Sequence, residues 1–164
     1  MRKRLLSVLI ALPLLLCACE RETLTDPVLF CESYNRIAPQ PISETDAYLR
    51  SENEFLLFTG ETLIRLKTNE DGAIHTAVVT GKGSDETASV AQYAFTALAQ
   101  PFSEAVPQSV TAQCTQQSLS VWTAETKRFY YAVYRDEESV TIVQTNRQLS
   151  SIPVLPSLRP SESE

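Results

Sequence analysis

The strongest constraint on the fold is an alternating segment that ends in a hairpin turn. Residues 62–67 alternate between two sides of an extended chain, and the side expected to face the core carries Thr62, Ile64 and Leu66. Residues 69–72, Asn-Glu-Asp-Gly, are a turn sequence because Gly takes a positive φ without strain. Residues 74–80 then pair back, and we expect Ile74, Thr76 and Val78 on their inner face. The fold is therefore expected to contain an antiparallel hairpin.

Further segments typical of strands lie on both sides of this hairpin. They are residues 47–50 and 55–59 before it, and residues 119–123, 129–134 and 139–145 after it. Polar turns separate several of these segments, as between neighbouring antiparallel strands. Residues 110–114 remain ambiguous.

Two segments have the spacing of amphipathic helices. The first, residues 26–38, opens with Thr25-Asp26-Pro27, where Thr25 or Asp26 is the cap and proline takes the first helical position. Its apolar face carries Phe30, Tyr34 and Ile37. The second helix, residues 86–100, follows Ser84 as the expected cap. Its regularly spaced apolar residues are Ala91, Ala94, Phe95, Leu98 and Phe102.

The order of these elements is helix, strands, helix, strands, so the two halves share a helix-then-hairpin layout. This order predicts an α+β domain over residues 26–147, with an antiparallel sheet and two helices packed on one face. The strands form either one sheet or two. Residues 148–164 are rich in Ser and Pro and end in Ser-Glu-Ser-Glu, so we expect a disordered tail there.

The N-terminal segment is expected to lie outside the fold. Residues 1–4 are Met-Arg-Lys-Arg, and residues 5–16 are apolar apart from Ser7. This run is too short to span a bilayer as a helix, which needs roughly 20 residues. A positively charged start followed by a short apolar stretch is typical of a secretory signal peptide.

The end of this segment resembles the lipobox of bacterial lipoproteins. The matching residues are Leu16, Ala18 and Cys19. The resemblance implies loss of residues 1–18, diacylglyceryl on the Cys19 sulfur, acylation of its new amine, and a lipidated tether over residues 19–25. An ordinary cleaved signal that contains cysteine is the alternative. Glu20 only partly matches the Asp that retains lipoproteins in the inner membrane, so we favour the outer membrane, with the protein facing the periplasm.

Two cysteines remain after this processing, Cys31 and Cys114. In an oxidising compartment such a pair is most simply a disulfide. The alternative is a redox or metal role, but the chain has no CxxC motif and His75 is its only imidazole. We therefore expect a structural disulfide between them.

The charge of the chain is acidic and becomes more so on processing. The precursor has 14 Lys and Arg against 20 Asp and Glu, a net charge of -6. The signal peptide carries three of the cations and none of the anions, so the mature side chains sum to -9. Nucleic acid is not expected as a partner, because phosphate binding needs concentrated Lys and Arg.

The residues that most often carry catalysis do not form a recognisable set. His75 lies mid-strand with an expected outward side chain, and no GxSxG surrounds any serine. The loop of residues 81–84, Gly-Lys-Gly-Ser, lacks the spacing of a phosphate loop. Several carboxylate pairs fall in polar turns, where they are expected to be solvated: Glu52 with Glu54, Glu70 with Asp71, and Asp136 with Glu137 and Glu138. We expect no catalytic residue, metal site or cofactor.

An aromatic strand supplies the clearest candidate for binding. Alternation places Phe129, Tyr131 and Val133 on one face of residues 129–134. Tyr130 and Tyr134 then lie on the other face, which we expect to expose them beside Trp122 as a partner-binding patch. The alternative is that both faces of this strand are covered.

These features favour a membrane-anchored, non-catalytic protein-binding module. In size and organisation alone, such a chain resembles immunity lipoproteins that neutralise toxins delivered into the periplasm, and an acidic surface suits a basic toxin. The alternative is a structural or accessory lipoprotein of an envelope or secretion assembly. A hydrolase that uses a carboxylate is less favoured.

Overall fold

The computed structural model describes residues 26–42, 48–51, 53–116 and 120–148. The expected signal peptide (1–18) and tether (19–25) lie outside these residues, as does the expected tail apart from Gln148. Among the described residues, no helix combines the length and the apolar character needed to cross a membrane.

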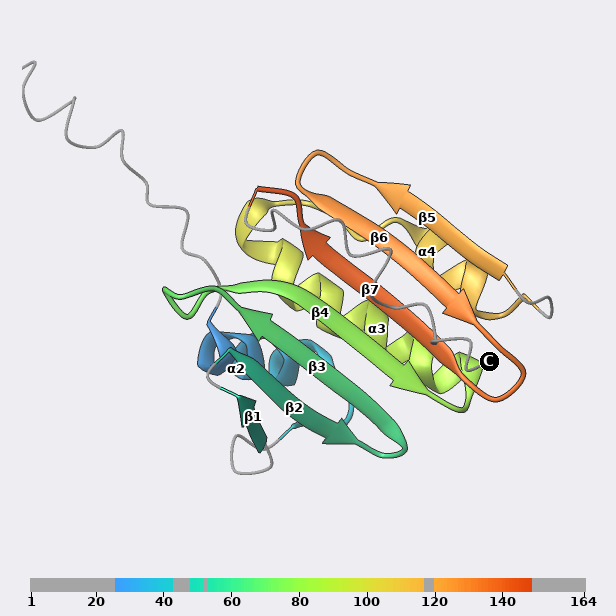
Figure 1. The fold of residues 1–164 in the computed structure, drawn as a ribbon, viewed down its shortest axis with the longest axis horizontal. Coiled ribbons are helices and arrows are strands. Elements are labelled where there is room, and N and C mark those ends of the chain that lie inside the picture. The colour runs from blue at the N-terminus through green and yellow to red at the C-terminus, as the bar shows by residue number, and fades with distance from the viewer. Residues whose placement is uncertain (1–25, 43–47, 52, 117–119, 149–164) are drawn as a thin grey trace, which may run out of the picture.

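The described strands form one antiparallel sheet of seven strands, in the order β1-β2-β3-β4-β7-β6-β5 (Figure 1). Their bounds are Tyr48–Ser51 (β1), Glu54–Thr59 (β2), Thr62–Thr68 (β3), Ile74–Gly81 (β4), Ser120–Glu125 (β5), Phe129–Arg135 (β6) and Val140–Asn146 (β7). Each segment expected to be a strand contains one of these strands, and all seven join a single sheet; residues 47 and 119, expected at strand ends, lie outside the described residues.

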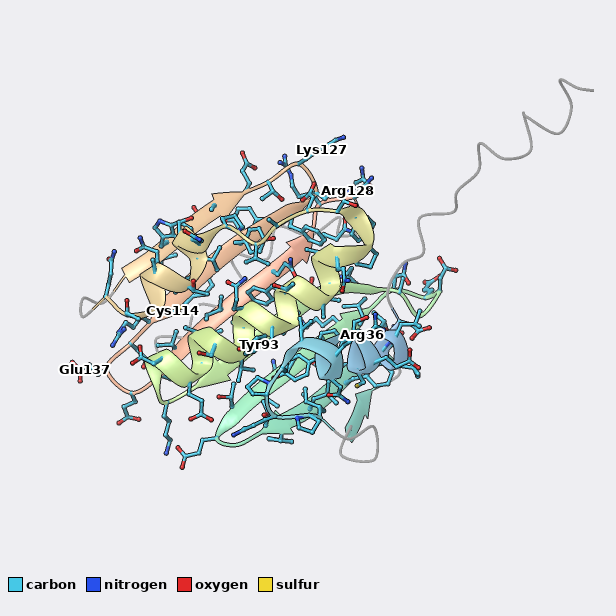
Figure 2. The ribbon with its side chains drawn as sticks, turned by 180° about the vertical axis from the view of Figure 1, so that it is seen from behind. Arg36, Tyr93, Cys114, Lys127, Arg128 and Glu137 are labelled. Atoms are coloured by element: carbon cyan, nitrogen blue, oxygen red, sulfur yellow. The ribbon has the colours of Figure 1, made fainter. Side chains whose placement is uncertain are left out.

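All the described helices lie on one face of this sheet, as Figures 1 and 2 show from the two sides. They are α2 (Pro27–Ile37), α3 (Ser84–Ala99), the short 3-10 turn η2 (Gln100–Phe102) and α4 (Gln108–Cys114). Helix α3 packs on the central strands β4 and β7, with α2 on one side of it and α4 on the other. The α+β class is confirmed, and the ambiguous residues 110–114 belong to a third helix.

The starts of the two long helices follow from local chemistry. Helix α2 has the expected cap, because Asp26 Oδ1 accepts a hydrogen bond of 2.8 Å from the Leu29 amide and Pro27 follows at the first helical position. Helix α3 starts earlier than expected, so its N-cap residue is Gly83 and the prediction of Ser84 as cap is wrong. Thr87 packs directly against Gly81 at the end of β4, where a side chain on Gly81 would collide with it.

The main core lies between the sheet and these helices. Helix α3 buries four of its expected apolar residues, Ala91, Ala94, Phe95 and Leu98, and Phe102 is partly buried. Helix α2 buries Phe30, Cys31 and Tyr34, but Ile37 at its last turn is exposed, contrary to expectation. Aromatic rings from the helix layer and the sheet contact each other in this core, for example Phe95 and Tyr131 at 6.0 Å between centroids.

A β-bulge between β3 and β4 changes which side chains of β4 face the core, so part of the prediction for this strand is wrong. Lys67 pairs with Thr76 and the next residue, Thr68, pairs with Ile74, so His75 is an extra residue in β4. An extra residue reverses the alternation beyond it. Ile74 faces the helices as expected, but Thr76 and Val78 face away, and Ala77 and Val79 join the main core instead.

Candidate functional site

The face of the sheet opposite the helices, called here the open face, carries a continuous row of partly exposed side chains. Its six residues lie directly opposite one another across neighbouring strands: Phe58, Leu63, Thr80, Thr141, Tyr134 and Val121. We call this row the exposed strip. It crosses β2, β3, β4, β7, β6 and β5, a length of roughly 24 Å at the usual strand spacing.

The ends of the exposed strip are apolar and open to solvent. Phe58 on β2 is 51% exposed and Val121 on β5 is 64% exposed. Between them, Thr80 and Thr141 share a hydrogen bond of 3.1 Å between their hydroxyl oxygens. Large apolar side chains aligned on one exposed face are typical of interaction surfaces rather than of solvated sheet faces.

The three residues expected to form a partner-binding patch lie on opposite faces of the sheet. They are Trp122, Tyr130 and Tyr134. Tyr130 and Tyr134 do lie on the open face, where each is partly buried. Trp122 lies on the helix side, because it pairs directly with Val133 and packs against the main core. The prediction of one patch with these three residues is therefore wrong. The exposed strip was missed because its members come from six strands whose register the sequence does not reveal.

Strand β5 forms one edge of the sheet. It pairs with β6 on one side and with no described strand on the other. Glu125 at its end makes an ion pair of 3.1 Å with Arg147, but the strand has neither the proline nor the lysine that often protects an edge. Its outer backbone groups are therefore suited to pairing with an added strand.

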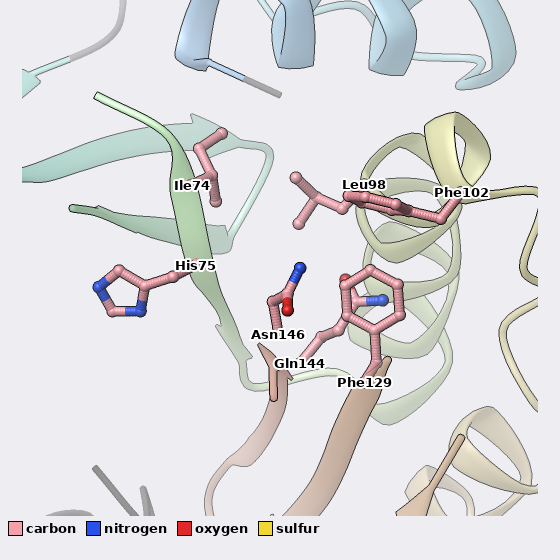
Figure 3. A pocket seen from close by; sticks show the side chains of 7 residues that line it. All are labelled: Ile74, His75, Leu98, Phe102, Phe129, Gln144 and Asn146. Atoms are coloured by element: carbon pink, nitrogen blue, oxygen red, sulfur yellow. The ribbon is translucent and has the colours of Figure 1, made fainter. Parts of the chain in front are cut away.

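A small cavity lies between the sheet and the end of α3 (Figure 3). It is lined by Ile74, His75, Leu98, Phe102, Phe129, Gln144 and Asn146. Its volume of about 10 Å³ is enough for one water molecule and for no organic substrate. The Gln144 side chain is buried beside it, and its Oε1 has no hydrogen-bond partner among the described residues. A water molecule is the simplest partner for that oxygen.

The titratable groups around this cavity are not arranged as an acid and a base. Gln144 Nε2 donates to the Tyr131 hydroxyl at 3.0 Å, and burial is the main cause that raises the pKa of Tyr131 to about 12. His75 points away from the other six side chains in Figure 3, and its Nδ1 lies 2.9 Å from the Thr76 hydroxyl oxygen. Burial, and then the positive charge of Lys67, lowers the pKa of His75. At neutral pH both rings are therefore uncharged.

The expected disulfide between Cys31 and Cys114 is wrong. Cys31 lies on α2 and Cys114 ends α4, and α3 lies between these two helices (Figures 1 and 2). The Cys114 thiol donates a hydrogen bond of 3.4 Å to the Val110 carbonyl oxygen, and burial raises its pKa to about 11. Both residues pack as small apolar side chains in the main core. Counting cysteines cannot reveal that a helix separates them.

The acidic residues expected in turns do lie in turns where the structure describes them, except Glu54, which begins β2 and makes an ion pair of 3.4 Å with Arg65. Asp136 closes the turn between β6 and β7, where it accepts hydrogen bonds from the Glu138 and Ser139 amides, and these bonds lower its pKa. Glu137 and Glu138 are exposed, as are Glu70 and Asp71 in the turn before β4. Within the described ranges, no three His, Cys, Asp or Glu side chains are placed to hold a metal ion. Glu52 lies outside these ranges.

Comparison with protein families, with curated proteins and with solved structures finds no match to this chain.

Proposed function

We propose that the protein is a lipid-anchored, non-catalytic binding module of the bacterial envelope that recognises a protein partner through the exposed strip. The observation that carries this proposal is the pair of apolar side chains, Phe58 and Val121, that remain exposed at the two ends of that strip. Residues of this kind lose contact with water when a partner docks, and their burial favours binding.

The shape and charge of the surface favour a protein over a small ligand. The described cavity takes one water molecule, whereas the strip runs across six strands. With a net side-chain charge of -9, the processed chain would attract a basic partner and associate with it faster. An immunity-type role, in which the partner is a toxin that reaches the periplasm, is the favoured form of the proposal.

A matched pair of substitutions tests the strip. Phe58 on the strip is 51% exposed and Val28 on α2, on the helix side, is 52% exposed. Phe58→Asp and Val28→Asp therefore each replace an apolar side chain of similar exposure with a carboxylate. The lipidated full chain of each variant would be purified gently from envelope membranes, and the amount of any co-purified partner compared with that of the wild type after circular dichroism confirms folding.

We expect Phe58→Asp to reduce the recovered partner by about tenfold or more, because a charge at the edge of a docked apolar surface must be desolvated. Val28→Asp should leave recovery unchanged. If the wild-type chain recovers no partner, or if all three chains recover it equally, the exposed strip is not the binding surface.

The alternative function, an accessory of an envelope or secretion assembly, is favoured by the unprotected edge of β5. A partner that adds a strand to this edge would crosslink to a photoreactive residue placed at Thr123 on β5. The recovery of such a partner would not change with Phe58→Asp, because Phe58 lies near the opposite edge of the sheet. The two candidate functions therefore give different results with the same variant.

The lipid anchor has its own test. Replacing Cys19 with Ala removes the sulfur that would receive diacylglyceryl, so the chain should lose lipid labelling and move from the membrane fraction to the soluble periplasm. A stable anchor requires more than one acyl chain, and this substitution would prevent the attachment of all of them. Unchanged membrane attachment of Cys19→Ala would refute the anchor.

A further inference from the structure

Strand β5 forms a longer and more regular sheet edge than β1 does. It has six residues, and the ladder that joins it to β6 runs without a register shift. Strand β1, at the other edge, has four residues and a register shift between Leu49 and Ser51. Short strands and bulges are common means by which proteins prevent a second chain from pairing with an edge. Of these two described edge strands, β1 has both features and β5 has neither.

The backbone hydrogen bonds show which residues of β5 would pair with an added strand. The Thr126 amide donates to the Phe129 carbonyl oxygen at 2.8 Å, so the backbone of Thr126 points towards β6. Backbone groups of successive residues point to opposite sides of a strand. The amides and carbonyls of Val121, Thr123 and Glu125 therefore point away from β6. These three residues are exposed, so the space beside them is open.

The two ends of this edge carry opposite charge. Lys127 and Arg128 form the turn between β5 and β6. Three acidic residues lie in the turn between β6 and β7, at the other end of these strands: Asp136, Glu137 and Glu138. Figure 2 shows Lys127 and Arg128 at one end of the strands and Glu137 at the other. Arg135 is the cation next to the acidic turn, and it donates to the Cys114 carbonyl oxygen.

The basic end keeps a net positive charge after its own carboxylates are counted. Glu125 is paired with Arg147 at 3.1 Å, and these two charges cancel. The Glu104 carboxylate also lies at this end, because it accepts a hydrogen bond of 2.8 Å from the Thr126 hydroxyl. The two cations of the turn between β5 and β6 outnumber this one carboxylate.

We propose that two copies of this chain pair through their β5 edges, antiparallel, across a twofold axis at Thr123. Antiparallel pairing brings the basic end of each copy beside the acidic end of the other, whereas parallel pairing would bring like charges together. A surface that complements itself in this way is what a twofold dimer requires. The processed chain carries a net charge of -9, so most of its surface repels a second copy. The β5 edge is where two copies attract each other.

An axis at Thr123 also matches the side chains along the two strands. Thr123 then lies opposite its own copy, and paired threonines stabilise antiparallel strands. On the helix side, the partly buried Trp122 lies opposite Ala124 of the second copy, so a large side chain meets a small one. On the open face, Val121 lies opposite Glu125 of the second copy. This register pairs the full length of β5.

The repulsion between the acidic surfaces limits the strength of this pair, so we expect the two copies to separate on dilution. In the separated chain, β5 pairs with β6 alone among the described strands. The pair joins the two sheets edge to edge and leaves the open face of each copy uncovered. It forms whether or not the exposed strip binds a partner.

Disulfide trapping in the full lipidated chain, purified in detergent, tests the register. Thr123→Cys places a thiol at the twofold axis, where the two Cα atoms would lie about 5.5 Å apart, within the range of a disulfide. Val121→Cys is the matched control on the same strand, because its two copies would lie about 14 Å apart along the strands. Cys31 and Cys114 are buried, so the wild-type chain supplies the background.

We expect mild oxidation to link two Thr123→Cys chains about tenfold faster or more than two Val121→Cys chains, because pairing holds only the first two thiols together. Dilution should slow this linkage. Equal rates for the two variants would mean that the chains meet at random in shared micelles. If Thr123→Cys does not fold, sedimentation of the wild-type chain over a range of concentrations replaces it, and a monomer at every concentration would refute the pair.

Charge reversal tests the antiparallel arrangement. In the Thr123→Cys chain, Lys127→Glu or Glu137→Lys should each slow the linkage by about tenfold or more, because each brings like charges together in the pair. Glu32→Lys, at an exposed position on α2, is the matched control for Glu137→Lys and should not slow it. An equal mixture of the Lys127→Glu and Glu137→Lys chains should regain the unmodified rate, because opposite charges meet again in the mixed pair.

Two results would overturn the arrangement or its occupant. A mixture that links no faster than its separate components would show that these charges do not orient the two copies. Thr123→Cys that links to a different protein in intact envelopes, and never to its own copy, would assign the β5 edge to a strand of that protein. The proposed function would survive either result, because Phe58→Asp tests the exposed strip separately.

Discussion

His75 is the extra residue at the point where the ladder between β3 and β4 slips. Its ring is half-buried, and its pKa is lowered first by that burial and then by the charge of Lys67. The fold therefore favours the neutral ring over the charged one. A group whose folded pKa lies below its unfolded value makes stability depend on pH, because the unfolded chain binds the proton more tightly.

Comparison with His75→Gln should reveal this dependence, since the chain has no other histidine. Above the unfolded pKa of about 6.5, the ring is neutral in both states and the full stability is present. As the pH falls below 6.5, the unfolded state gains a proton first, so the wild type should lose stability relative to the variant until the folded pKa is passed. Urea unfolding of both proteins at pH 7.5 and pH 5.0 measures the change. Equal losses in both proteins would mean that His75 contributes nothing.

For single residues, the sequence predicted regular alternation along a strand correctly, but it did not predict where a bulge interrupts that alternation. The inner positions Thr62, Ile64 and Leu66 are buried as expected, because no bulge interrupts the alternation along β3 between them. Thr76 and Val78 face the other way because one inserted residue reverses a pattern that is otherwise intact. No local signal at His75 distinguishes a bulged residue from a regular one.

Helix α4 depends on a contact from a distant strand. It has seven residues, fewer than an isolated helix needs to be stable in water. The Arg135 guanidinium, on β6, donates a hydrogen bond to the Cys114 carbonyl oxygen at the last residue of this helix. A cation at a helix C-terminus satisfies an unpaired carbonyl and interacts favourably with the helix dipole.

Removing this contact should destabilise the protein. We expect Arg135→Ala to lower the free energy of unfolding by about 1.5 kcal/mol, the lower end of the usual range for a hydrogen bond to a charged group, because this contact is only partly buried. Arg135→Lys should retain part of that energy, because the charge remains but its geometry changes. Urea unfolding measures both, with Lys127→Ala as the control because Lys127 is exposed. A loss no larger than that of Lys127→Ala would show that α4 does not need the contact.

The sequence predicted the two long helices but did not predict α4. Helices α2 and α3 were predicted because each has at least eleven residues in which apolar positions recur. In α4 only Val110 and Cys114 are buried, and two positions are too few to establish a period. Its helical state depends on packing against α3 and β6, which are remote in sequence.

The whole molecule consists of two similar halves that share one sheet. Each half has helical elements followed by an antiparallel run of strands, β1-β2-β3-β4 in the first half and β5-β6-β7 in the second. The last strand of each run pairs with the other, and this β4–β7 ladder joins the halves beneath α3 (Figure 1). The sequence showed the shared layout, but the central ladder joins strands separated by more than fifty residues, and no local pattern specifies that pairing.

Amide hydrogen exchange should reveal this arrangement. Strands β4 and β7 each pair on both sides and lie beneath α3, so their amides should exchange only when the whole domain unfolds. Strand β5 pairs on one side only, and its central amides should exchange about a hundredfold faster or more through local opening. A reducing agent should leave these rates unchanged, because Cys31 and Cys114 are not joined. If the amides of β5 and β4 exchange equally slowly, the edge of the sheet opens only together with its centre. A partner strand could then be added at β5 only when the whole domain unfolds.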